Sequence, residues 1–65
     1  MITIEIAKQR SDALLVAMVG KQMVDDWWNS PNRAFDMRSP VDVWKDDYNV
    51  VYDYLIRHAF IGGGS

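Results

Sequence analysis

The sequence predicts an all-α protein, a small bundle of about four short helices with an extended N-terminal arm. Three observations favour this fold class. Apolar residues recur at helical intervals of three and four residues on both sides of a turn at Pro31. A Ser-Pro pair at Ser39 and Pro40 is typical of a helix start. The only strand-like alternation lies at the N-terminus, and no second segment of that kind offers a pairing partner.

Chain length and composition indicate one small domain. A chain of 65 residues buries only about 60% of its unfolded surface, so a single core should give roughly 3–5 kcal/mol of stability. Apolar residues make up 49% of the chain, which indicates a folded protein. There is no cysteine, so neither a disulfide nor a thiolate metal site is available. This composition fits a cytoplasmic location.

Charge and hydropathy argue against two classes of partner. The longest apolar stretch, residues 13–19, is far shorter than the ~20 residues that a spanning helix needs. The formal net charge is −2, and the Lys and Arg residues are scattered rather than gathered in a basic stripe. Neither a membrane nor nucleic acid is therefore expected as a partner.

Residues 1–10 are expected to form an arm outside the helical domain. Ile2, Ile4 and Ile6 alternate with Thr3 and Glu5, which is strand periodicity. The segment could be an extended arm, an edge that pairs between two copies, or the start of a helix. We favour the arm, and a homodimer stays open.

Two helices are expected over residues 11–19 and 21–29. The Ser11 hydroxyl can cap the first, and Gly20, which costs about 1 kcal/mol inside a helix, should separate the two. A helical stripe runs along them with a spacing of four and three, widened on one side by two longer side chains. The stripe consists of Ala13, Ala17, Gly20, Val24 and Trp27, with Leu14 and Met18 beside it.

A turn and a third helix should follow. Pro31 ends the second helix because the residue before a proline disfavours helical dihedral angles. Ser39 should cap the third helix, with Pro40 at its first position and Asp42 completing a box-like cap. This helix should be short and end at about residue 45.

The last helix should be capped by Asp46 or Asp47. Asp53 and Arg57 lie four residues apart and can form an ion pair on it. Glycines at 62–64 should end it. Its inward stripe is expected to consist of Val50, Val51, Tyr54, Leu55 and His58.

The inventory of reactive side chains argues against an enzyme. His58, the only histidine, lies at the edge of an apolar helix face and is more often structural in such a place. Asp25-Asp26 and Asp46-Asp47 are the only carboxylate pairs, and adjacent residues on a helix point about 100° apart. We therefore expect no catalytic residue, no bound metal and no cofactor.

Exposed aromatic residues point instead to a protein interface. Tyr48 and Tyr52 lie off the inward stripe of the last helix, and Tyr/Trp clusters are typical of interface hot spots. Core-edge positions are an equally good reading of both residues. The residues expected to bind a partner are Tyr48, Tyr52, Arg57, Phe60, Gly62, Gly63 and Trp27.

One ordered set of residues resembles a known family. Trp28 is followed by the Pro31-Asn32 turn, then Phe35, then the helix start at Ser39-Pro40. The spacing resembles that of the toxin-binding domain of the Xre/MbcA/ParS antitoxins. On this reading residues 11–65 form the antitoxin-like domain, and Trp28 and Phe35 should be buried on either side of the turn. The chain departs from the family pattern in three respects. Asp36 stands where a glycine is common, Trp44 replaces a leucine, and the pair Asp46-Asp47 replaces the usual glycine before the last helix.

The resemblance implies a function for the chain. Such antitoxin domains inhibit a RES-type, NAD-consuming toxin by blocking its active site, partly with their C-terminal tail. The helix-turn-helix half of the family is not expected here, since ten residues before the first cap cannot form one. The alternative is a small phage or mobile-element protein that uses this fold to bind and inhibit another host protein.

Overall fold

The computed structural model describes residues 2–61, and these form helices joined by short turns. The four α-helices in this range are α1 (Ile4–Val19), α2 (Val24–Asn29), α3 (Pro40–Asp46) and α4 (Tyr48–Ile61). Two 3₁₀ helices, η1 (Lys21–Met23) and η2 (Arg33–Phe35), lie before α2 and before α3. No β-strand occurs between residues 2 and 61, apart from an isolated bridge between Asn32 and Arg38. The prediction of an all-α fold is confirmed.

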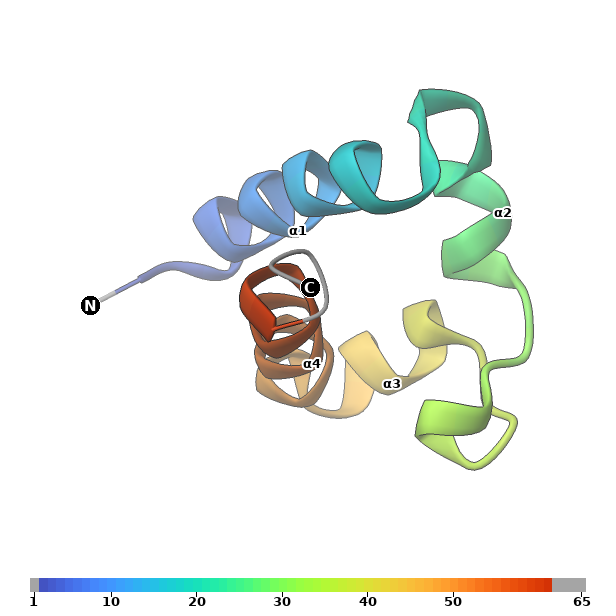
Figure 1. Cartoon of the computed structure of the whole chain (residues 1–65). Coiled ribbons are helices and arrows are strands. Elements are labelled where there is room, and N and C mark those ends of the chain that lie inside the picture. The colour runs from blue at the N-terminus through green and yellow to red at the C-terminus, as the bar shows by residue number, and fades with distance from the viewer. Residues whose placement is uncertain (1, 62–65) are drawn as a thin grey trace.

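The helices enclose one core. The chain runs along α1, turns through η1 into α2, descends past η2 and returns along α3 (Figure 1). The final helix, α4, lies beneath α1 and is seen nearly end-on while α1 runs across the view. Helix α4 packs against both α1 and α3, and α2 packs against α1 and α3. Each of the four α-helices therefore packs against two others around the core.

The first helix begins at Ile4 and not at Ser11. The Thr3 hydroxyl accepts a hydrogen bond from the Ile6 amide at 3.2 Å, so Thr3 is the N-cap. The extended arm predicted for residues 1–10 is wrong for residues 4–10, which belong to α1, and the weaker alternative of a helix start is correct there. Isoleucine fits either a strand or a helix, and two hydroxyl residues, Thr3 and Ser11, compete as caps in the sequence.

Helix α1 is buried along a different line from the predicted one. Ala7, Ser11 and Leu15, each four residues apart, are fully buried. The predicted stripe residues Ala13 and Ala17 are exposed. Small side chains at positions 7 and 11 let another backbone come close, and α4 packs on α1. The burial line follows this close packing and not the longest apolar run.

The break at Gly20 is confirmed. Its φ of 90° lies in a region that side chains other than glycine rarely adopt, and its amide donates to the Val16 carbonyl at 3.1 Å. The residues that follow, Lys21–Met23, form a turn of 3₁₀ helix, so the second α-helix is shorter than the predicted range 21–29.

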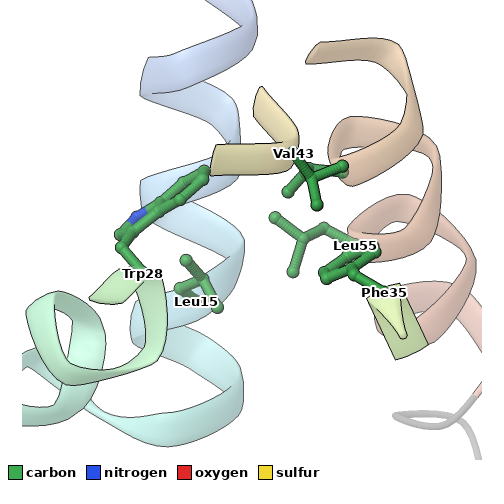
Figure 2. Packing of buried hydrophobic residues seen from close by; sticks show 6 residues of the cluster. Leu15, Trp28, Phe35, Val43 and Leu55 are labelled. Atoms are coloured by element: carbon green, nitrogen blue, oxygen red, sulfur yellow. The ribbon is translucent and has the colours of Figure 1, made fainter. Parts of the chain in front are cut away.

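The core gathers side chains from five elements. Trp28 from α2 and Leu15 from α1 lie side by side, and Val43, Phe35 and Leu55 point into the same interior from α3, η2 and α4 (Figure 2). Trp28 and Phe35 are only 5% and 7% exposed, which confirms their predicted burial. Around this core pack partly buried side chains: Leu14, Val24, Trp27, Val41, Trp44 and Tyr54.

Helices α3 and α4 begin where the sequence predicts. Ser39 is the N-cap residue of α3 and Pro40 is its first residue, although the Ser39 side chain makes no capping bond. The Asp47 carboxylate accepts from the Asn49 amide at 3.1 Å at the start of α4. On α4, Val51 and Leu55 are fully buried as predicted. The inward positions predicted for Val50 and His58 are wrong, because both are exposed.

The buried Ser11 hydroxyl gives a stability prediction. Its oxygen is buried and has no hydrogen-bond partner among the described residues, and an unsatisfied buried hydroxyl is destabilising. Alanine also has the higher helix propensity. We expect Ser11→Ala to raise the unfolding free energy by about 1 kcal/mol, or the melting temperature by about 4–8 °C. Thermal circular dichroism measures this, with the exposed Ser30→Ala as control. A Ser11→Ala protein that melts below the parent would contradict it.

No helix within residues 2–61 is both long and apolar enough to cross a membrane.

Candidate partner-binding surface

A polar contact joins the buried Trp28 side chain to α1. The indole Nε1 donates to the Asp12 carboxylate at 2.9 Å. Lys8 pairs with the same carboxylate at 2.9 Å, and its Nζ lies 4.7 Å from the centroid of the Trp28 ring. The indole donor is thus satisfied although the ring is buried, and a cation lies over the ring. These three residues join α2 to α1.

Removing the Asp12 carboxylate should cost more than removing an ordinary surface carboxylate. Asp12→Ala leaves the buried Nε1 donor of Trp28 without its acceptor, and we expect a loss of about 1–2 kcal/mol in unfolding free energy. The control is Asp53→Ala, which breaks the exposed i,i+4 pair with Arg57 and should cost a few tenths of a kcal/mol. Urea denaturation compares the two. Equal losses of unfolding free energy in the two variants would show that the hydrogen bond from the indole to Asp12 contributes nothing to stability.

Hydrogen bonds within the turn after α2 fix its conformation. The Asn32 side chain accepts from the Ala34 amide at 2.9 Å, and the Asn32 amide donates to the Arg38 carbonyl at 3.1 Å. Asp36 and Met37 have positive φ values of 55° and 66°. Asp36 therefore adopts the left-handed conformation that a glycine would take most easily at this position.

Aromatic rings continue from the core to the surface on two sides. On one side Trp28 contacts Trp44, with ring centroids 5.4 Å apart, and Trp44 contacts Tyr48 at 5.4 Å. On the other, Trp27 and Tyr54 stack at 6.4 Å. Trp27 also packs against the core, so it is a second core-edge residue that keeps part of its surface in solvent.

The predicted partner-binding residues lie in different surface hollows. Tyr52 lines a hollow of about 440 Å³ between α1 and α4, and accepts a hydrogen bond from Arg10 at 3.3 Å. Arg57 lines another, of about 300 Å³, and pairs with Asp53 at 2.9 Å. Trp27 lines a third, of about 240 Å³, beside Met23. These residues therefore do not form one patch.

The remaining predicted partner residues are placed only in part. Tyr48 begins α4 and is partly buried against Trp44. Phe60 belongs to α4, and its predicted role stays a prediction. Gly62 and Gly63 lie outside the described residues.

The acidic pairs have structural partners. Asp46 pairs with Arg38 at 2.6 Å and Asp47 caps α4, while Asp25 and Asp26 occupy the first turn of α2, where the helix dipole favours negative charge. Among residues 2–61, no three His, Asp or Glu side chains come together in a way that could hold a metal ion.

The hollow between α1 and α4 was not among the sites predicted from the sequence. Its lining includes Arg10, Ala13, Leu14 and Ile56 besides Tyr52. A signal was present in part: Arg10 and Leu14 are one helical turn apart, as are Tyr52 and Ile56. This spacing indicates a shared helix face only if residue 10 is helical. The extended arm predicted for residues 1–10 excluded that.

Comparison with known proteins adds no relative. No protein-family model, no curated protein and no solved structure matches this chain.

Proposed function

We propose that the chain is a non-catalytic protein-binding module that inhibits a RES-type, NAD-consuming toxin, in the manner of the toxin-binding domain of an Xre/MbcA/ParS antitoxin. Binding would block the toxin's active site, and the proposal places both proteins in the cytoplasm of a bacterium.

The turn between α2 and α3 is the observation that carries this proposal. Trp28 and Phe35, the two anchors of the resemblance, are buried on either side of Pro31. The position where the family commonly has glycine is Asp36, and its backbone is left-handed, as a glycine there would allow. The backbone at Asp36 is thus in a conformation that a glycine would adopt readily, which is compatible with the resemblance.

The surface chemistry also supports binding rather than catalysis. The described surface offers aromatic and apolar side chains at three hollows, each with at least one charged residue in its lining. Apolar and aromatic side chains with a few charged groups are what protein interfaces use. The carboxylates of Asp12, Asp46, Asp47 and Asp53 are each held by a structural contact.

The proposal is tested by identifying the bound protein. The tagged chain is expressed in its source organism and recovered with its partner, which mass spectrometry identifies. We expect a protein with a RES domain, encoded beside this chain. Recovery of a different host protein, with phage genes as neighbours, would replace the toxin by the alternative target while keeping the binding function.

A further inference from the structure

We propose that the hollow between α1 and α4 docks an acidic segment of the partner protein. A carboxylate of that segment binds Arg10, and an adjacent apolar side chain packs on Leu14 and Ile56. The inference rests on the proposed function only in that the chain binds a protein, and it does not depend on the partner being a toxin.

The size of the hollow suits two neighbouring side chains of a partner. It has a volume of about 440 Å³, and α1 crosses α4 steeply in Figure 1. Leu14 from α1 and Tyr52 and Ile56 from α4 supply apolar surface, and each keeps part of it in solvent. Ala13 has a short side chain and leaves room above the backbone of α1. The lining is therefore mostly apolar, with one cation at its edge.

Arg10 is the charged group that such a partner would satisfy. Among the other Lys and Arg residues, Lys8, Arg38 and Arg57 each pair with a carboxylate. The remaining three, Lys21, Arg33 and Lys45, line none of the three hollows. Arg10 makes no ion pair within residues 2–61, and its one side-chain bond goes to the Tyr52 hydroxyl. A guanidinium has five donors arranged as a fork that fits a carboxylate, so most of its donor capacity is free.

Tyr52 makes the site more selective for a carboxylate. Its hydroxyl accepts from Arg10 Nη1 at 3.3 Å, which orients the guanidinium and leaves the hydroxyl proton to be donated. Two donors can therefore meet one acidic group, next to apolar surface. Charge-assisted pairs of this kind are the stronger hydrogen bonds at interfaces. The hollow beside Arg57 lacks this feature, because Asp53 already neutralises that guanidinium.

A protein segment fits this site better than a small carboxylate does. Sites for small molecules enclose about 70–90% of the ligand surface. Here Arg10 and Ala13 are exposed, so the hollow lies open on that side. A protein segment can cover the open side with its own backbone, and a free fatty acid cannot.

Selection of short random peptides on the full-length chain tests the proposal. We expect the enriched peptides to carry Asp or Glu within four positions of a large apolar residue. They should bind Arg10→Glu at least about tenfold more weakly than the parent. The control is Arg33→Glu, which makes the same charge change at an exposed residue of η2 and should bind like the parent. In ¹H–¹⁵N spectra the largest shifts should fall on residues 10, 14, 52 and 56.

Several outcomes would overturn the inference. One is that the selected peptides lack an acidic residue. Another is that the parent chain enriches acidic peptides no more than Arg10→Glu does. A third is equal weakening by Arg33→Glu, which would mean unspecific attraction. Concentration-dependent shifts at the same residues without peptide would assign the hollow to a second copy. Displacement of the peptides by decanoate at equal concentration would assign it to a small carboxylate. Thermal melting checks that Arg10→Glu is folded. Failure to inhibit a RES-type toxin leaves each of these readouts unaffected.

Discussion

Trp28→Ala should unfold the protein. Trp28 lies at the centre of the core, 5% exposed, with its ring 5.2 Å from Trp27 and 5.4 Å from Trp44. Its indole also joins α2 to α1 through Asp12. Truncating a buried tryptophan costs about 3–5 kcal/mol. That is close to the whole stability, roughly 3–5 kcal/mol, expected of a core this small. Far-ultraviolet circular dichroism at 25 °C should therefore show loss of helix.

Trp28→Phe separates the packing of the ring from its hydrogen bond. Phenylalanine keeps an aromatic ring in the core but cannot donate to Asp12. We expect this variant to fold with a loss of about 1–2 kcal/mol. A Trp28→Ala protein with the parent's melting curve would contradict the assigned core, because Trp28 belongs to that core and also joins α2 to α1 through Asp12.

Tyr52→Ala should weaken partner binding by about 2 kcal/mol, or about 30-fold in Kd. Tyr52 lines the hollow between α1 and α4 and orients Arg10. It is partly exposed and is not one of the core residues, so the fold should be retained. Isothermal titration against the protein recovered with the chain measures the change in Kd.

Tyr48→Ala is the matched control for this substitution. It removes the same side chain one turn earlier on α4, where the ring contacts Trp44 and not the hollow. We expect a smaller loss of binding than for Tyr52→Ala, because Tyr48 does not line the hollow. If Tyr48→Ala loses binding and Tyr52→Ala does not, the interface lies at the corner of α3 and α4. If both bind like the parent, the hollow beside Trp27 becomes the better candidate.

The tail prediction follows from the resemblance alone. Antitoxins of this type block the toxin partly with their C-terminal tail, so deleting residues 62–65 should reduce inhibition more than binding. Equal losses of binding and inhibition would show that the tail only contributes contacts.

Element ends were largely predictable because local chemistry sets them. Gly20 ends α1 with a backbone conformation that suits glycine, Pro40 begins α3, and Asp47 caps α4 through its own carboxylate. Each of these residues acts within a few positions of itself. Burial of Trp28 was predicted from the resemblance, because the adjacent Trp27 is an equally large aromatic residue and the local pattern does not choose between them.

The face that α1 buries could not be predicted in the same way. Apolar residues surround this helix, so its hydrophobic pattern does not select one face. The choice depends on where α4 packs, and the small side chains of Ala7 and Ser11 let it come close. The same tertiary contact creates the hollow beside Arg10. A site that forms where two helices meet cannot be predicted from the residue spacing of either helix alone.

The most direct test of the central claim is a titration of toxin activity. NAD consumption by a RES-type toxin, the proposed partner, is measured while the purified chain is added. We expect a linear fall in activity that ends at a fixed molar ratio, with no NAD consumed by the chain alone. Full toxin activity at saturating chain, or NAD consumption by the chain itself, would contradict it.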